Sequence, residues 1–294
     1  MEAAIRISNW CIIVNELKQE LLTDVDFAGK FYKSLAEHAS FINENPENII
    51  IKNNHFISNL AGLFIIYSLF PVFKNNSRLL KKTSQKLRNE LKNQVYEDGV
   101  DMEGSTAYHR FVTELFFLPF FLSEKLALNL FDQQDSARLH NMFLFIRHVI
   151  KPSGNIIQFG DNDSGRLIKL FERPALSQDY MLSLGFGLFK DRDLYIKEFP
   201  FDILGYVVWG DEVKKRYESE TNSIFQLSVK AFKASGIYIL RNDKFFAAIS
   251  AIPNGNGVHT HNDKLSFELA FKVYDIIVDP GTYCLLYTSD AADE

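Results

Sequence analysis

The 294-residue sequence predicts an α+β protein in which a helical region occupies about the first 200 residues and antiparallel strands follow it. Up to about residue 200, apolar side chains recur every three or four positions, which is the spacing of a helix with one buried face. From about residue 225 they alternate, which is the spacing of a strand. Hydrophobic residues make up 47% of the chain, so a sizeable core can form, and a disordered or collagen-like protein is excluded.

The first half of the helical region contains four predicted helices. Two of them cover residues 5–21 and 27–45, and the second ends at an Asn-Pro pair. A third begins at Asn53 or Asn54, either of which can cap a helix. This third helix is apolar on almost every side and should be buried, whereas the charged segment 78–95 should lie on the outside.

Three further helices should begin near Ser105, Leu139 and Ser177. Pro119 should kink the first of these, and the sequence Lys-Pro-Ser-Gly at 151–154 should end the second. Helices of similar length that are joined by short loops indicate an array of helical hairpins.

Strands are predicted at residues 225–229, in a hairpin that turns at Asn242-Asp243, and in a second hairpin that turns near Tyr274-Asp275. Antiparallel hairpins after a run of helices are typical of the α+β class. We therefore expect a helical domain at residues 1–200 and the N-terminal part of a sheet domain at residues 201–283.

The chain has 32 Lys and Arg against 37 Asp and Glu, which gives a net charge of -5 and an isoelectric point of about 5.9. This balance does not favour a nucleic-acid partner, because phosphate binding needs a basic face, but a few local cations can still bind an anionic substrate. No apolar run reaches the roughly 18 residues of a membrane-spanning helix, and no signal peptide pattern is visible. The two cysteines, Cys11 and Cys284, permit at most one disulfide.

The last residues of the chain, CLLYTSDAADE at 284–294, resemble the translation of a sequencing adapter more than a protein segment. We expect Tyr283 to be the last natural residue and Cys284 to be non-native. The alternative is a genuine polar C-terminus.

The densest group of reactive side chains is His259-Thr260-His261-Asn262-Asp263, which follows the Gly-rich loop Asn-Gly-Asn-Gly. In an extended chain alternate residues share a face, so His259, His261 and Asp263 can converge on one metal ion or one substrate. A histidine pair suits zinc, and the alternative is a set of exposed polar residues. A hairpin would also bring Asp279 beside His261 as a third ligand, unless Asp-Pro-Gly is an ordinary turn.

Two helix starts carry further candidate residues. Asn53-Asn54-His55 opens the buried helix, where free backbone N–H groups favour an anion such as a carboxylate, although an asparagine there serves equally well as a cap. In Tyr108-His109-Arg110, a tyrosine beside a cation can have a lowered pKa and carry protons. The alternative for this second group is a plain amphipathic helix turn.

Weaker signals come from two other places. In GDNDSGR, Asp161, Asp163 and Arg166 form either a polar site or a solvated loop, and we favour the loop. Arg6 and Asn9 share a face of the first helix, which by itself identifies no function.

Together these segments resemble the heparinase II/III-like family of polysaccharide lyases. The most specific match is HTHNDKLSFELAF with IIVDPGTY, and NNHFISN, EGSTAYHR and GDNDSGR are similar to other family segments in the same order. The resemblance implies an incomplete (α/α) toroid of helical hairpins followed by the start of an antiparallel β-sandwich domain. Family members are longer than this chain, so we expect parts of both domains to lie beyond its two ends.

The family reaction is β-elimination at a uronic acid of an acidic polysaccharide, which requires three steps: neutralising the carboxylate, removing the C5 proton and protonating the leaving O4. The resemblance assigns the first step to Asn54 and His55. It assigns the proton transfers to Tyr108 and His259, without deciding which of them is the base. The further residues expected to bind substrate are Arg110, Asn53, Arg6 and Asn9.

By the same resemblance, His261 and Asp279 are ligands of a structural Zn²⁺ ion, and His259 is turned towards the substrate instead. A further histidine ligand would lie beyond Tyr283, so the zinc site is expected to be incomplete and the chain alone inactive. The resemblance also implies a location in the periplasm or cell envelope.

Two other functions remain open. A metallo-hydrolase of the β-lactamase type carries H-x-H-x-D-H, but Lys264 replaces the last histidine and the long helical region does not fit that fold. A non-catalytic protein that binds or assembles surface polysaccharide would keep the lyase fold without releasing an unsaturated product. The sequence specifies neither the polysaccharide nor the oligomeric state.

Overall fold

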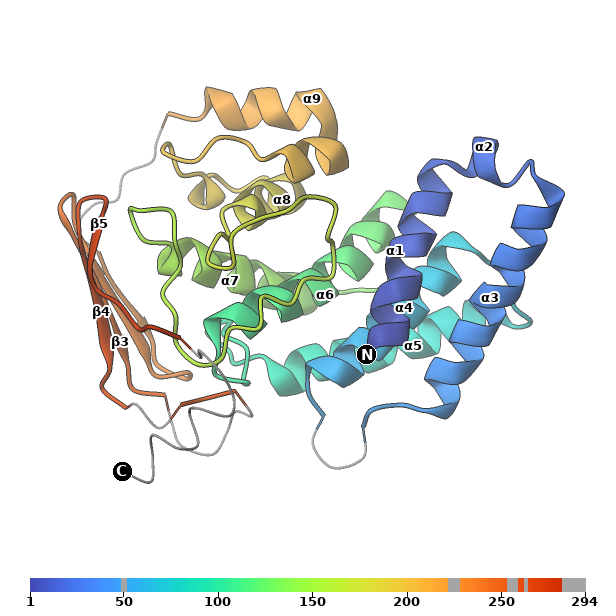
Figure 1. Ribbon diagram of the computed structural model, residues 1–294, viewed down its shortest axis with the longest axis horizontal. Coiled ribbons are helices and arrows are strands. Elements are labelled where there is room, and N and C mark those ends of the chain that lie inside the picture. Colours follow the sequence, from blue (N-terminus) through green and yellow to red (C-terminus); the bar gives the residue numbers. More distant parts are fainter. Residues whose placement is uncertain (49–51, 222–227, 253–258, 262–263, 282–294) are drawn as a thin grey trace. The chain divides into compact units, whose positions relative to one another are not determined.

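The computed structural model describes residues 1–48, 52–221, 228–252, 259–261 and 264–281 (Figure 1). The expectations for residues 225–227, the Gly-rich loop, Asn262, Asp263 and the tail from Cys284 lie outside these ranges. The helices are α1 (Glu2–Glu16), α2 (Lys18–Leu21), α3 (Val25–Glu44), α4 (Asn54–Leu69), α5 (Asn76–Gln94), α6 (Thr106–Lys125), α7 (Gln133–Val149), α8 (Tyr180–Phe189), the 3₁₀ helix η1 (Arg192–Leu194) and α9 (Ile203–Ser219). The strands are β1 (Ser228–Phe232), β2 (Ile237–Arg241), β3 (Phe245–Ser250), β4 (Phe267–Phe271) and β5 (Tyr274–Ile277).

The chain divides into two compact units, and each unit is discontinuous in sequence. The first comprises Met1–Gln94 and Val112–Ser136, and the second comprises Val95–Phe111 and Ala137–Glu294. One boundary therefore lies at the end of α5, and the other two fall inside α6 and α7. The sequence predicts a division near residue 200 instead, but helical structure continues beyond that position in α9.

In the first unit, α4 is buried because its side chains are apolar or small on nearly every face, as predicted. Its start is fixed by Asn53, whose side chain accepts a hydrogen bond from the backbone N–H of His55 at 3.1 Å. α1 can approach α4 closely because Gly62 has no side chain, and a Cβ atom there would lie 2.9 Å from the Cβ of Ala4. The predicted caps and periodicity thus account for this core.

The charged helix α5 also follows the predicted pattern. In α5 the narrow apolar stripe at Leu87 and Leu91 is fully buried, whereas most charged positions are exposed. α6 continues through Pro119. Over the residues that the structure describes, no helix is both long and apolar enough to cross a membrane.

The segment 150–179 of the second unit contains no helix, although the sequence predicts an almost wholly helical region up to residue 200. Gly154 and Gly160 have φ angles of +91° and +73°, which interrupt helical geometry. Backbone groups of this segment bond to other parts of the unit instead, as where the N–H of Thr106 donates to the carbonyl of Phe159 at 3.0 Å. Such long-range pairing leaves no local periodicity to read.

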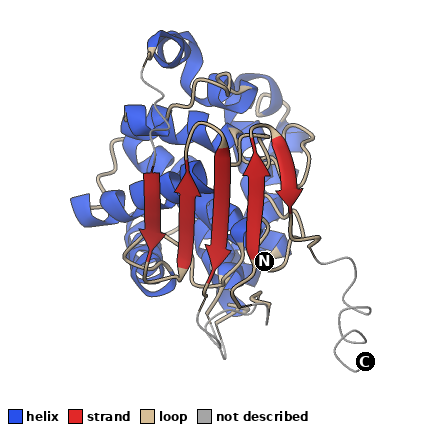
Figure 2. Cartoon of the chain, turned by 90° about the vertical axis from the view of Figure 1, so that its left-hand side faces the viewer, coloured by secondary structure: helices blue, strands red, loops and turns tan. Residues whose placement is uncertain are grey.

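In the part of the chain that the structure describes, five strands form one antiparallel sheet in which consecutive strands are neighbours (Figure 2). The hairpin turn at Asn242-Asp243 is confirmed, because the N–H of Asn242 donates to the carbonyl of Phe245 across it. The second turn is wrong by two residues: Phe271 pairs with Tyr274, and Lys272 takes the turn conformation with a φ of +52°.

A buried ionic cluster ties the segment after α7 to the sheet within the second unit. The ammonium group of Lys151 lies 2.7 Å from the carboxylate of Glu268 on β4 and 3.1 Å from that of Asp275 on β5. Glu268 also accepts a hydrogen bond from the backbone N–H of Gln158. The same carboxylate therefore neutralises a buried lysine and fixes the start of the loop that carries Asp161.

Candidate active site

Three segments of the second unit meet beside the first turn of α6: residues 103–108, 158–163 and 259–261. The N–H of Asp161 donates a hydrogen bond to the carbonyl of His259 at 3.0 Å, although the two residues are far apart in the sequence. This backbone pairing holds the side chains of the three segments against each other.

Two glycines make this close approach possible. Gly160 has a φ of +73°, and a Cβ atom there would lie 2.4 Å from the carbonyl oxygen of His259. Gly104 has a φ of +75°, and its Cβ would lie 2.0 Å from the methyl carbon of Thr260. Any other residue at either position would be strained and would push the segments apart.

The central feature is a stacked pair of rings, Tyr108 and His259. Their centroids are 3.6 Å apart and their planes are inclined by 13°. Tyr108 is positioned by Ser105, whose hydroxyl accepts a hydrogen bond from the N–H of Tyr108 at 3.2 Å and donates to the carbonyl of Asp161. Ser105 therefore caps α6 and joins two of the three segments. The structure brings together the two residues that the sequence assigns to proton transfer.

Asp161 contacts both histidines of the His259-Thr260-His261 motif. One carboxylate oxygen lies 3.0 Å from Nδ1 of His259 and the other lies 2.9 Å from Nε2 of His261. A carboxylate only accepts hydrogen bonds, so each of these ring nitrogens carries the proton. In a neutral His259 the remaining nitrogen, Nε2, is then the one with a lone pair, and it lies 3.6 Å from a carboxylate oxygen of Glu103.

The electrostatic environment keeps Tyr108 protonated. Burial raises the pKa of the Tyr108 phenol, and so do the hydrogen bond to Asp163 and the negative charges of Asp163, Asp161 and Glu103. The phenol donates its proton to the carboxylate of Asp163. The expectation of a lowered pKa is therefore wrong, because three carboxylates rather than a cation surround this hydroxyl.

Arg110 does not supply that cation. Its guanidinium is fully buried and donates to the carbonyl of Gly165 at 2.6 Å and to that of Ala175 at 3.5 Å. The physical reason is helical geometry: residues two positions apart do not share a helix face, so Tyr108 and Arg110 point in different directions. Arg110 positions the loop that follows Asp163, and a role in binding substrate stays a prediction.

His109 belongs to the packing behind the ring pair. Its Nδ1 accepts from the backbone N–H of Asp101 at 3.1 Å and its Nε2 faces the carbonyl of Met142 at 3.1 Å. Burial lowers the pKa of His109 to about 4, so it is neutral.

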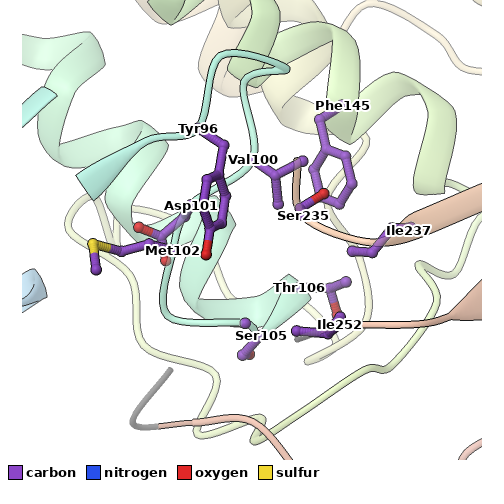
Figure 3. A pocket seen from close by; sticks show the side chains of 11 residues that line it. Tyr96, Val100, Asp101, Met102, Ser105, Thr106, Phe145, Ser235, Ile237 and Ile252 are labelled. Carbon is purple, nitrogen blue, oxygen red and sulfur yellow. The ribbon is translucent and has the colours of Figure 1, made fainter. Parts of the chain in front are cut away.

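A cavity of about 10 Å³, lined by Asp101, Tyr96 and Phe145 among others, lies in this region (Figure 3). It has the size of one water molecule, so no sugar can bind there.

Asn54 and His55 lie in the first unit. Asn54 is fully buried in the first turn of α4. Nδ1 of His55 lies 2.9 Å from the carboxylate of Glu47, and Glu47 also accepts from the side chain of Asn59 at 3.0 Å. Glu47, His55 and Asn59 line a cavity of about 380 Å³. The expectation that Asn54 and His55 share one cleft with Tyr108 and His259 stays a prediction.

The other substrate-binding candidates of the first unit have ordinary local contacts. Asn53 caps α4, which is the alternative that the sequence allows. The side-chain amide of Asn9 donates to the carbonyl of Ile5 one turn earlier at 2.9 Å. Arg6 is exposed on α1. Substrate binding by these residues stays a prediction.

The zinc ligands expected at His261 and Asp279 do not lie on neighbouring strands. His261 precedes β4 and contacts Asp161, and Asp279 follows β5 and accepts a hydrogen bond from the N–H of Gly281 at 2.7 Å. In the part of the chain that the structure describes, no three His, Cys, Asp or Glu side chains are grouped so that they could hold a metal ion. The described residues therefore do not form a zinc site by themselves.

Two carboxylates of the cluster come from GDNDSGR, for which the sequence allows a polar site but favours a solvated loop. Asp161 and Asp163 contact His259 and Tyr108, so that preference is wrong. The third carboxylate, Glu103, is almost fully buried beside His259 and is not a candidate on sequence grounds. One usable signal existed: two acidic residues directly follow Gly160 in GDNDSGR, and a glycine there permits close approach by another backbone.

Two models of one protein family match the chain. Residues 1–173 match "Heparinase II/III N-terminus", and residues 226–292 match "Heparinase II/III-like, C-terminal". The chain is 23% identical over 308 residues to a heparin-sulfate lyase of Bacteroides thetaiotaomicron, and the match covers 98% of this chain and 41% of that protein.

Two solved structures show the same fold. A crystal structure of heparinase III has a TM-score of 0.74 at 18% identity, covering 96% of this chain and 42% of that one. Heparan sulfate lyase HepC from Pedobacter heparinus has a TM-score of 0.61 at 20% identity, covering 88% of this chain and 37% of that one. The α+β class with helices before an antiparallel sheet is thus confirmed, and the chain spans about two fifths of the length of these relatives.

Proposed function

We propose that the protein is a polysaccharide lyase, because the chain belongs to the heparinase II/III family and its second unit holds a tyrosine and a histidine ready for proton transfer. The observation that carries the proposal is the stacked pair of Tyr108 and His259, with Asp161 fixing the histidine and Asp163 the tyrosine. The substrate class is an acidic polysaccharide that contains uronic acid, in line with the heparin-sulfate lyase to which the chain is similar.

The geometry favours His259 as the base and Tyr108 as the acid. With Nδ1–H donated to Asp161, Nε2 of His259 can take the C5 proton of the uronic acid. The electrons of the C5–H bond then form the C4–C5 double bond as the C4–O4 bond breaks. Tyr108 donates its proton to the leaving O4, which as an alkoxide is more basic than the phenolate that results. The raised pKa of Tyr108 keeps this proton in place until the bond breaks.

Neutralising the substrate carboxylate requires groups outside this cluster, since Glu103, Asp161 and Asp163 carry negative charge. We assign this role to Asn54 and His55 at the start of α4, on the family resemblance and on the positive end of the helix dipole. An amide and an imidazole at a helix N-terminus are suitable donors to a carboxylate, and the stabilisation of the developing enolate is the largest electrostatic contribution to such a reaction.

A structural zinc ion at His261 and Asp279 remains part of the proposal, with further ligands from outside the described residues. Because Asp161 contacts Nε2 of His261, Nδ1 is the ring nitrogen that would face the metal. The ion would hold chain segments together and take no part in the proton transfers. Metal analysis of the purified protein tests this, and a His261→Ala variant with unchanged zinc content would contradict it.

We also propose a periplasmic or cell-envelope location, which fractionation of the source cells would test.

Because the chain alone is expected to be inactive, the lyase activity is tested on the complete gene product. It is incubated with a panel of acidic glycans, among them heparin, heparan sulfate and alginate, and the ultraviolet absorbance of the 4,5-unsaturated product is followed. Tyr108→Phe and His259→Gln should each lower turnover by about 10²–10⁴-fold, the usual contribution of an acid or base. Tyr206→Phe, on the exposed side of α9, is the matched control and should leave turnover unchanged. Binding of a glycan with no product from any of them would favour the non-catalytic alternative instead.

A further inference from the structure

The outer face of α5 carries an unusual distribution of charge. Its exposed cations are Arg78, Lys81, Lys82, Lys86 and Lys92, and its other exposed positions are serine, asparagine or glutamine. The single carboxylate of this helix, Glu90, points inward, where its side chain is buried and 2.8 Å from the ammonium group of Lys52. A chain with a net charge of -5 thus has one helix face, hereafter the basic face, on which the helix itself exposes no carboxylate. The nearest acidic partner is Asp132, which pairs with Arg88 and lies near Lys92.

Other surface helices of the protein pair their lysines with carboxylates one turn away. On α3, Lys30 lies 2.6 Å from Asp26, and Lys33 lies 3.9 Å from Glu37. On α9, Lys214 lies 3.9 Å from Glu218. Such pairs at four-residue spacing stabilise a helix, and like charges at the same spacing destabilise it.

In α5 the same spacing holds like charges instead. Arg78, Lys82 and Lys86 follow each other four residues apart, and within the described ranges none of them forms an ion pair. Burial lowers the pKa of Lys86, and the nearby charges of Lys82 and Lys52 lower it further. The ammonium groups are therefore close enough to repel each other. Because this arrangement costs helix stability, helix formation does not explain it.

We propose that the basic face binds an acidic polysaccharide chain. This inference rests on the proposed function and extends it to a second contact area, on the first unit. The cations recur along the helix at about 6 Å per four residues, so that they can meet successive acidic groups of an extended polymer. The neutral amides between them can donate to sugar hydroxyls. The area includes Lys52, which lies two positions before Asn54 at the start of α4.

The composition of the basic face favours a glycan over the other common polyanions. It exposes no aromatic ring, on which the bases of a single-stranded nucleic acid would stack. It exposes no apolar side chain, which a helix lying on a membrane would insert between lipids. Charges and amides alone suit a flexible, hydroxyl-rich anionic chain.

The test compares two variants of the whole chain with equal loss of charge. The first is Arg78→Gln/Lys82→Gln/Lys86→Gln on the basic face, and the second is Lys30→Gln/Lys33→Gln/Lys214→Gln, which removes three paired lysines elsewhere. Binding of fluorescently labelled heparin is measured by anisotropy at several salt concentrations. The first variant should bind about tenfold more weakly at low salt and show a shallower salt dependence, because fewer counterions are released on binding. The second should bind like the unmodified protein.

A charge reversal separates binding from folding. In Lys82→Glu, the new carboxylate precedes Lys86 by four residues in the favourable orientation, so the melting temperature should stay equal or rise, while heparin affinity should fall. Equal affinity losses in the two triple variants would overturn the inference. Stronger binding of the protein to duplex DNA or to phosphatidylserine vesicles than to heparin would also overturn it. Absence of lyase product together with the expected affinity pattern would refute the proposed function alone.

Discussion

Asp161 is the residue whose replacement tests the candidate active site most directly. Its two carboxylate oxygens accept hydrogen bonds from Nδ1 of His259 at 3.0 Å and from Nε2 of His261 at 2.9 Å. Asp161→Asn keeps the size of the side chain but leaves one oxygen to accept. Its amide NH₂ group would face the other imidazole, which must then change its tautomer or turn away.

The magnitude follows from the hydrogen bond that is lost. A hydrogen bond to a charged group contributes about 1.5–3 kcal/mol, and about 1.4 kcal/mol corresponds to a factor of ten in rate. If Asp161 orients His259 for proton removal, kcat should fall by about 10- to 150-fold in Asp161→Asn, and further in Asp161→Ala, which loses both bonds. KM should change much less, because Asp161 does not attract an anionic substrate.

The assay is the initial rate of unsaturated-product formation over a range of glycan concentrations, which separates kcat from KM. Asp163→Asn is the matched control: it removes the same charge, but it contacts Tyr108 and its remaining oxygen can still accept the phenol proton. Its kcat should therefore fall less. A kcat that is unchanged in Asp161→Asn, or equal losses in the two variants, would show that orientation of His259 does not limit the reaction.

Three further predictions concern stability. Gly160→Ala should cost at least about 1–3 kcal/mol, because a Cβ at a φ of +73° would lie 2.4 Å from the carbonyl oxygen of His259; an unchanged melting temperature would contradict this. Burial lowers the pKa of His109 to about 4, so its contribution to the free energy of unfolding is fully present above about pH 6.5. This contribution should be lost as the pH falls towards 4, by roughly 3 kcal/mol in total. Urea unfolding at several pH values should show this slope, and His109→Gln should remove it. Lys151→Met should cost about 3–5 kcal/mol by leaving Glu268 buried without its cation, and adding Glu268→Leu should recover part of the loss; a double variant no more stable than the single one would argue against the pair.

The elements that local periodicity encodes could be predicted from the sequence. The all-round apolar pattern of α4 and the narrow stripe of α5 each correspond to a helix with the expected burial. The strands from β2 onward follow the alternation of apolar residues, with errors of a few residues at their ends. Helix and strand formation at these places depends on residues that are close in the sequence, so the sequence of one chain is enough to predict it.

The segment between α7 and α8 could not be predicted in the same way. Its conformation depends on glycines at positive φ and on hydrogen bonds from distant side chains, such as Arg110 to the carbonyl of Gly165. The carboxylate of Asp161 reaches a histidine 98 positions later in the chain. Motif resemblance indicates Tyr108 and His259 as a pair, and the structure stacks their rings. An aspartate in a polar loop, in contrast, has the same local appearance whether it is solvated or part of a site.

The charge distribution suggests why affinity and chemistry would depend on different parts of this chain. The cluster around Tyr108 and His259 contains three carboxylates, which keep Tyr108 protonated and orient His259 but repel an acidic polymer. Attraction must then come from cations elsewhere, and the basic face of α5 offers Arg78, Lys82 and Lys86, none of which forms an ion pair within the described ranges. Since salt screens attraction between exposed charges far more than it affects buried hydrogen bonds, rising ionic strength should increase KM for a long glycan and leave kcat nearly constant. A parallel fall of kcat would mean that exposed cations also act in the chemical step, and the assignment of chemistry to the carboxylate-bound pair alone would have to be abandoned.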